Sequence, residues 1–474
     1  MKIKSKASIV MSALMIMSSL TACTTKQETK DQSSSNVKIE VAKTVDVENA
    51  LKDKNSIVLD ARSNDAYNGW KEDGVKIGGH IKGAKDFSAR WLKADYDEKE
   101  NLEKYSRDKV LSDAIKNKEL SKDKSIIVYD TNGKDAKEVA NFLAKKGMDK
   151  IKTYDANEWV NSNKPMESYK NYALLVSPNI VKSIVDGKTP ESFTDIKNVK
   201  IVDVRWGDNK ESGYLDGHIP TAIHINTDSF EPPKKNKDGD DEWKLADDKT
   251  LEKLLVDNGI TANDTIIATS PEPMAASRFA VICKYMGVKD VRVMNGGIVG
   301  WTSQGYKLDK KEEKAKKADS FRITVPANPD VIDTLSEIKS IMDNKVQHPD
   351  FQLIDNRTIG EFNGEVTGYS YHKKKGRIPG AIFGHAGIKN SSSMYYYRNI
   401  DKTMRNQEEI EALWKKDGID SNKHMSFFCG SGWRAAEILW YANVMGHENA
   451  SLFSDGWIGW SNAGYKIETG APKK

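Results

Sequence analysis

The sequence has few cysteines, no strong excess of either charge, and no long apolar run after its first residues. Three cysteines in 474 residues cannot supply a disulfide framework. The eight histidines show no metal-ligand spacing and no Cys-x-x-Cys occurs, so we expect no metal and no other cofactor. A formal net charge of +4 gives no indication of nucleic-acid binding, which normally shows as a strong basic excess. These absences leave a hydrophilic globular protein.

The longest apolar run covers residues 7–20 and follows a basic start of three lysines. It is too short for a comfortable membrane span and has the layout of a secretory signal. It ends in Leu20-Thr21-Ala22-Cys23, which resembles the lipobox of a bacterial lipoprotein. The resemblance implies that residues 1–22 are a signal peptide and that Cys23 is lipidated. The chain would then lie outside the cytoplasm, in the cell envelope, with the lipid as its only membrane anchor. The alternative is an ordinary signal with a chance cysteine.

An internal repeat organises the rest of the chain. An apolar strand that ends in Asp-x-Arg occurs three times, at residues 57–62, 201–205 and 353–357. A turn and a second short strand follow each copy, at residues 79–84, 217–222 and 376–381. A later apolar strand and a closing tryptophan complete each copy, at residues 125–129, 265–269 and 425–428, and at Trp159, Trp301 and Trp460. Such landmarks, in the same order three times, indicate a tandem repeat.

The repeat divides the body of the chain into unit one (residues 41–168), unit two (residues 169–310) and unit three (residues 322–474). Residues 23–40 are polar and predict a flexible stem, and residues 311–321 predict a linker. Within each unit, short apolar strands alternate with helical patterns. This order predicts an α/β fold in which helices cover both faces of a mainly parallel sheet.

The loop after residues 425–428 has the composition of a nucleophilic anion site. It reads Cys429-Gly430-Ser431-Gly432-Trp433-Arg434 and leads into a helical pattern. A cysteine at a helix N-terminus lies in the positive end of the helix dipole, which favours the reactive thiolate. Glycines allow backbone angles that turn successive amides toward an anion, and an arginine adds a fixed cation. We expect Cys429 to be the nucleophile and residues 430–434 to bind the substrate.

Together with Asp-x-Arg, Gly-x-Ile-Pro-Gly-Ala and the closing Asp455-Gly456-Trp457, this loop resembles a rhodanese domain. Essentially all of the mature chain resembles three tandem rhodanese-like domains of the bacterial envelope. The resemblance implies a sulfurtransferase. In such an enzyme Cys429 would take the outer sulfur of thiosulfate as a persulfide, release sulfite, and pass the sulfur to cyanide or a thiol.

Units one and two lack the cysteine. Counted back from the glycine after each helix, Asp130 and Ser270 take the place of Cys429. An aspartate cannot carry sulfur, and its charge repels thiosulfate. In the second loop, Pro271 and Pro273 remove two amide donors. We expect both units to be inactive and to have a structural role, such as walling one side of the site in unit three.

Other conspicuous residues have simpler interpretations. Cys283 lies in an apolar run and is expected in the core. The Asp-x-Arg arginines recur in units without a cysteine, which favours a structural role. His80 and His218 are replaced by Arg377 in unit three, so we assign them no catalytic role. The tyrosine-rich residues 384–405 border either the pocket or a partner unit.

Several alternatives stay open. Cysteine phosphatases and arsenate reductases generally place five residues between cysteine and arginine, whereas four separate Cys429 from Arg434. A non-catalytic surface lipoprotein would use the three units as a binding scaffold. Arg434 contacts the substrate or carbonyls of its own loop, and Trp433 covers the pocket or packs against a neighbouring unit. Fast alkylation of Cys429 and slow alkylation of Cys283 would favour an enzyme.

Overall fold

The computed structural model describes residues 39–71, 78–99, 101–193, 196, 198–237, 239 and 241–472. All of them belong to one compact unit, Ile39–Lys474. The predicted signal peptide, the predicted lipidation at Cys23 and nearly all of the predicted stem lie outside the described residues. No helix in the described part of the chain is long and apolar enough to cross a membrane.

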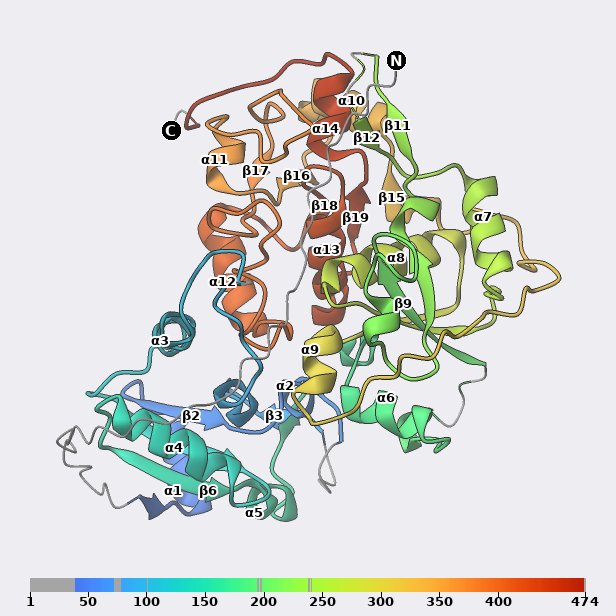
Figure 1. Ribbon diagram of the computed structural model, residues 1–474. Coiled ribbons are helices and arrows are strands. Elements are labelled where there is room, and N and C mark those ends of the chain that lie inside the picture. Colours follow the sequence, from blue (N-terminus) through green and yellow to red (C-terminus); the bar gives the residue numbers. More distant parts are fainter. Residues whose placement is uncertain are drawn as a thin grey trace, which may run out of the picture. The chain divides into compact units, whose positions relative to one another are not determined.

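In the described part of the chain, each unit contains a five-stranded sheet whose neighbouring strands all run parallel, as predicted (Figure 1). The three sheets share one strand order, with the strand before the Cys429-type loop in the middle and the Asp-x-Arg strand beside it. In sheet order the strands are β1 (Glu40–Val41), β6 (Ile151–Asp155), β5 (Ser125–Asp130), β2 (Ser56–Asp60) and β4 (Lys85–Asp86) in unit one; β8 (Leu175–Val176), β14 (Asp290–Met294), β13 (Thr265–Thr269), β9 (Val199–Arg205) and β10 (Ile223–Asn226) in unit two; and β15 (Ile332–Asp333), β19 (Ala450–Phe453), β18 (His424–Phe428), β16 (Phe351–Asp355) and β17 (Ile382–Phe383) in unit three.

Helices connect these strands, and several begin at a side chain that caps the first turn, such as Asp247 before α7 and Asn406 before α12. The helices are α1 (Thr44–Ala50), α2 (Asn64–Asn68), α3 (Arg107–Asn117), α4 (Asp135–Lys145) and α5 (Ala156–Asn161) in unit one; α6 (Pro178–Val185), α7 (Asp248–Asp257), α8 (Pro273–Met286) and α9 (Gly297–Thr302) in unit two; and α10 (Leu335–Asp343), α11 (Ile359–Phe362), α12 (Gln407–Asp417), α13 (Trp433–Met445) and α14 (Gly456–Asn462) in unit three. Two short antiparallel pairs stand apart from the main sheets, β3 (His80–Ile81) with β7 (Met166–Glu167) and β11 (Pro233–Lys235) with β12 (Asp241–Trp243).

The second short strand predicted after each Asp-x-Arg strand is present in unit one as β3 (His80–Ile81), although it pairs with β7 and not with the main sheet. In units two and three the prediction is wrong in position, because no strand of the described chain lies within residues 217–222 or 376–381 and the main-sheet strand begins after them, at Ile223 and Ile382. In each unit the alanine amide bonds to the isoleucine carbonyl three residues earlier. The residue before the alanine has a positive φ, at Gly83, Thr221 and Gly380. This left-handed residue is typical of a type II turn, so the chain reverses before the main-sheet strand begins.

Helices α8 and α13 pack against each other across the boundary between units two and three (Figure 1). Both helices are buried nearly all round, because each lies between its own sheet and the other helix. One continuous apolar cluster extends from Val202 in unit two to Trp440 in unit three. The predicted linker is also attached to unit two, since the Ala318 amide bonds to the Val256 carbonyl and Phe321 is buried. Units two and three therefore share one core.

Candidate functional site

The register of the sheets places Cys429 and its two counterparts at equivalent positions. The Asp-x-Arg aspartate pairs with the residue just before Cys429 in unit three, just before Ser270 in unit two and just before Asp130 in unit one. The correspondence predicted by counting is thus confirmed. Cys429 is 1% exposed and lies between the end of β18 and the start of α13.

The backbone of the Cys429 loop turns its carbonyls and amides in opposite directions. The carbonyls of Cys429 and Gly430 accept hydrogen bonds of 2.8 and 3.0 Å from the amides of Trp457 and Ile458, at the start of α14. The closing Asp-Gly-Trp motif therefore holds the back of the loop. No acceptor in the described part of the chain takes the amides of residues 430–435. These amides form a concentrated set of donors at a helix N-terminus, which is the arrangement that binds anions.

Two tyrosines that sequence reasoning missed lie against this loop. A Cβ on Gly430 would be 2.0 Å from the Tyr369 hydroxyl, so a glycine is required there. Burial holds the pKa of Tyr369 well above its usual range, and the hydroxyl keeps its proton. Burial, the largest cause, and the proximity of Cys429 also raise the pKa of Tyr371. Both tyrosines come from the irregular residues 363–376, and no periodic signal in the sequence marks them.

Arg434 is held by a carboxylate in this structure. Its Nη1 and Nη2 atoms each lie 3.0 Å from an oxygen of Glu361, and Nη2 also donates to the Tyr369 hydroxyl at 2.7 Å. Burial raises the pKa of Glu361, but the charge and hydrogen bonds of Arg434, the charge of Arg357 and the Thr358 amide together hold this pKa below its usual range. The charge of Arg434 is therefore neutralised inside unit three. Its predicted contact with the substrate stays a prediction.

Unit two contributes side chains to the same loop. Trp433 donates its ring N–H to a Glu231 oxygen at 2.6 Å, which favours packing against a neighbouring unit over covering the pocket. The other Glu231 oxygen accepts from Arg278 Nε at 2.6 Å. Arg278 Nη2 reaches the hydroxyl of Ser454, just before the Asp-Gly-Trp motif, at 2.6 Å. Unit two thus walls one side of the loop, as expected.

In unit one the equivalent loop is filled by its own aspartate. The Asp130 carboxylate accepts from the amides of Gly133 and Ala136 at 3.1 and 2.8 Å. By position in the repeat, these amides correspond to those of Gly432 and Ala435 in unit three. Asp130 is buried together with these bonds. In unit one, therefore, two amides of the loop hold the carboxylate of the loop's own aspartate.

In unit two the loop has lost this capacity. Pro273 stands where unit three has Gly432, so the corresponding amide is missing. The Ser270 hydroxyl accepts from the Glu272 amide at 3.1 Å. Glu272 itself pairs with Arg398 of unit three at 2.6 Å. The loop is consequently part of the contact between the two units.

The simpler interpretations of the other conspicuous residues are confirmed. Cys283 is fully buried, and burial raises its thiol pKa. The Asp-x-Arg arginines are buried, pair with their aspartates, and donate to the carbonyls of Gly79, Gly217 and Gly376. His80 and His218 stack on tyrosine rings at centroid distances of 3.8 Å, and each Nδ1 is hydrogen bonded to the carbonyl of that tyrosine. These groups brace the fold.

Residues 384–405 face the partner units rather than Cys429. The Tyr395 hydroxyl donates to Asp113 of unit one, and the Tyr395 ring packs on Tyr105. Arg398 joins Glu272 of unit two to Glu437 on α13. The segment also lines a cavity of about 300 Å³ bordered by residues of all three units. Of the two possible roles for this segment, the contacts favour the partner-unit role.

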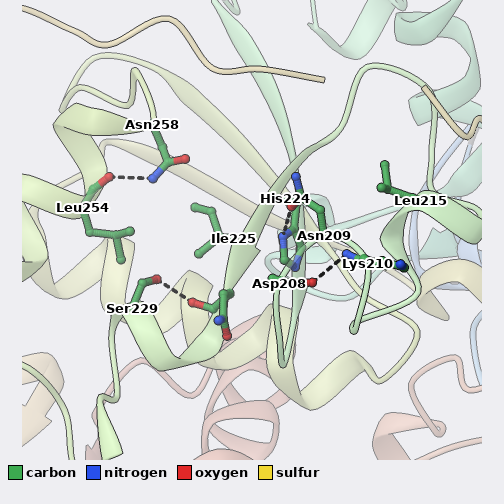
Figure 2. A pocket seen from close by; sticks show the side chains of 10 residues that line it. Asp208, Asn209, Lys210, Leu215, His224, Ile225, Ser229, Leu254 and Asn258 are labelled. Atoms are coloured by element: carbon green, nitrogen blue, oxygen red, sulfur yellow. Dashed lines mark hydrogen bonds between the residues drawn. The ribbon is translucent and has the colours of Figure 1, made fainter. Parts of the chain in front are cut away.

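A larger hollow, of about 540 Å³, lies in unit two beside the edge strand β10 (Figure 2). In Figure 2, His224 Nδ1 contacts the Asn209 side-chain oxygen, at a distance of 2.6 Å. Burial and the neighbouring Arg205 lower the pKa of His224 to about 4. Cys429 does not line this hollow. Among the described residues, no group of three or more His, Cys, Asp or Glu side chains is arranged to hold a metal ion.

Comparison with known proteins agrees with this geometry. The family model for the rhodanese-like domain matches residues 44–160, 189–304 and 334–463. Thiosulfate sulfurtransferase YnjE of Escherichia coli (strain K12) is 32% identical over 413 residues, which are 87% of this chain and 88% of YnjE. The structure of EanB with ergothioneine is similar at a TM-score of 0.82 and 31% identity, over 92% of this chain and 100% of that one. An anaerobic ergothioneine biosynthesis enzyme from Chlorobium limicola, in complex with trimethyl histidine, gives a TM-score of 0.80 at 30% identity over 92% and 100%. The chain belongs to the rhodanese-like family and is a sulfurtransferase with three tandem rhodanese-like domains.

Proposed function

We propose that the chain transfers the sulfane sulfur of thiosulfate, through a persulfide on Cys429, to cyanide or a thiol. One observation carries this proposal. Cys429 is a cysteine at the N-terminus of α13, beside amides of residues 430–435 that have no acceptor in the described part of the chain. The equivalent amides of unit one hold a carboxylate. A nucleophile next to an anion site suits a reaction between a thiolate and a small oxyanion.

The reaction has two steps. The Cys429 thiolate attacks the outer sulfur of thiosulfate, an S–S bond forms to Cys429, and the S–S bond to the sulfonate sulfur breaks. Sulfite leaves with the electron pair, and the persulfide keeps one negative charge. Cyanide then attacks the terminal sulfur, thiocyanate leaves, and the thiolate is restored. The unpaired amides hold the sulfonate oxygens in the first step and the persulfide between the steps.

Intact mass spectrometry tests this proposal. The chain is weighed before and after incubation with thiosulfate, in the wild type and in Cys429→Ser and Cys283→Ser. We expect a gain of one sulfur atom in the wild type and in Cys283→Ser, reversed by cyanide with release of thiocyanate. Cys429→Ser gains nothing. A folded wild type with a free thiol and no mass gain would exclude thiosulfate as the donor.

A second candidate differs in the acceptor, which would be the imidazole ring of a betaine such as trimethyl histidine. The rings of Tyr369, Tyr371 and Trp243 form a series with centroid distances of 5.6 and 5.0 Å, and Glu231 lies close by. Aromatic faces beside a carboxylate suit a flat, positively charged ligand. EanB, which has a similar fold, was solved with ergothioneine and with hercynine.

The two acceptors are separated by one competition experiment. The persulfide form is incubated with a mixture of cyanide, a small thiol and trimethyl histidine, and the products are identified by mass. Thiocyanate or a low-molecular-weight persulfide supports the first candidate, and sulfur added to the imidazole ring supports the second. Hydrolysis of a phosphate ester or reduction of arsenate would instead indicate the oxyanion chemistry of a cysteine phosphatase or arsenate reductase.

We also propose that the chain is attached outside the cytoplasm through a lipid on Cys23. The support is the basic start, the apolar run and the lipobox-like residues 20–23. Incorporation of labelled fatty acid into the wild type but not into Cys23→Ala is the expected result. Labelling of both, or of neither, would contradict it.

A further inference from the structure

We propose that Arg278 of unit two is a substrate-binding residue of unit three, and that its Nη1 group binds the anionic end of the sulfur donor. This inference rests on the proposed function and deepens it. It assigns the cation of the site to a unit that has no nucleophile of its own.

The side chain of Arg278 is fully buried and fixed on two of its three nitrogen atoms. Nε donates to Glu231 and Nη2 to the Ser454 hydroxyl, each at 2.6 Å. Nη1 is buried and has no hydrogen-bond partner in the described part of the chain. A buried donor without a partner is costly, so such groups normally have a ligand or a function.

The free Nη1 group lies beside the Cys429 loop, at Gly432. It is 3.0 Å from the position that a Cβ on Gly432 would occupy, and the Ser454 carbonyl oxygen is equally near that position. Gly432 has a φ of +89° and precedes the first residue of α13. In unit one the amide at the position of Gly432 donates to the Asp130 carboxylate. Nη1 therefore neighbours the residue whose counterpart in unit one helps to hold a carboxylate.

Arg434, which the sequence suggests as the substrate-binding cation, already has a counter-ion. Arg434 is neutralised by Glu361 through two hydrogen bonds. In Arg278 the Glu231 carboxylate is bonded at Nε, so the Nη1 side of the guanidinium keeps two free N–H donors toward the loop. A planar guanidinium with free donors matches the oxygens of a sulfonate. Glu231 in turn is positioned by Trp433 of unit three.

Two alkylating reagents of similar size test the assignment on the whole chain. Iodoacetate is an anion and iodoacetamide is its neutral counterpart, so the ratio of their rate constants at Cys429 reports anion binding beside the thiol. We expect Arg278→Gln to lower this ratio about tenfold or more, the usual cost of losing a charge-assisted hydrogen bond. Arg292→Gln removes an equal charge from unit two at a residue paired with Asp290, and is expected to leave the ratio unchanged.

A purely structural role would slow both reagents equally in Arg278→Gln, and that result would overturn the assignment. If this variant does not fold, Glu231→Gln decides. It removes the carboxylate that balances Arg278, so the ratio should rise; a ratio that stays or falls would reject the assignment. Failure of the proposed function looks different, because thiosulfate would then add no mass while the ratio still depended on Arg278.

Discussion

At the scale of single residues, the same backbone position holds Asp130, Ser270 and Cys429, and each side chain has a different consequence for the amides around it. Asp130 supplies the anion itself. Ser270 accepts from one amide, and a proline removes another. Cys429 leaves the amides without an acceptor in the described part of the chain, which is the observation behind the proposed function.

Asp130→Ala should destabilise unit one without affecting sulfur loading. The change leaves the amides of Gly133 and Ala136 without their acceptor, which typically costs about 1–3 kcal/mol. Urea unfolding measures the loss, and intact mass after thiosulfate measures loading. Asp149→Ala, an exposed residue of the same unit, is the matched control. Equal stability of the two variants would show that the carboxylate does not hold the loop.

Glu361→Gln should destabilise the chain at neutral pH and much less in acid. It leaves Arg434 buried without a counter-charge, a loss that typically costs about 3–5 kcal/mol. The pKa of Glu361 is lowered in the folded chain, so the stability from this pair is present above the ordinary value of 4.5 and disappears as the pH falls through the folded-state pKa. Unfolding in urea at pH 7, 5 and 4 should show the difference between wild type and variant shrinking only at the acid end. A constant difference would contradict the ion pair.

At the scale of elements, residues 363–376 pack on the loop that carries Cys429. Tyr369 is hydrogen bonded to Arg434 and lies against Gly430. Tyr371 packs at its other side on Trp243 of the β11–β12 hairpin, with ring centroids 5.0 Å apart. Unit two therefore contacts the same segment that lies against the Cys429 loop.

Tyr369→Ala should expose the thiol. Because the ring no longer covers Gly430, we expect iodoacetamide to modify Cys429 several times faster than in the wild type. Tyr396→Ala, which removes a tyrosine packed edge-to-face against His385 in the same unit, should leave the rate unchanged. Peptide mass spectrometry gives both rates, and buried Cys283 serves as an internal check that the fold is intact. An unchanged or slower rate in Tyr369→Ala would mean that another group limits access.

The repeated motifs predicted the sheets and the alignment of the three loops, because each depends on residues close together in the sequence. The inactivity of units one and two stays a prediction. In units two and three the main-sheet strand begins later than predicted, because a left-handed residue, Thr221 or Gly380, turns the chain first. Tyr369 and Glu361 could not be predicted, since they reach the loop from an irregular segment and a short helix. Arg278 lies on a helix of another unit, so only the packing of α8 on α13 brings it to the site.

At the scale of the molecule, units two and three are joined by one apolar core. They share an apolar cluster, and Arg398 bridges Glu272 of unit two to Glu437 on α13. Helix α13 is buried on all sides, and one of these sides faces α8. The repeat therefore suggests three separable domains, whereas the packing makes two of them interdependent.

Truncation tests this interdependence. Residues 169–474 should be soluble and should accept sulfur at Cys429, although with lower stability because the contacts of Tyr395 with unit one are lost. Residues 322–474 alone should aggregate, because the apolar surface of α13 that faces α8 becomes exposed. Soluble expression and intact mass after thiosulfate are the measurements. A soluble and active unit three would show that unit two is dispensable.

The filled loop of unit one also acts as a template. The Asp130 carboxylate acts as a ligand that is part of the chain. Its hydrogen bonds show the size and orientation of a group that fits such a loop. The design of an inhibitor of unit three can therefore begin from the position of the Asp130 carboxylate in unit one. A small carboxylate aimed at the amides of Gly432 and Ala435 is the starting fragment, and a second acceptor directed at Arg278 would extend it toward unit two.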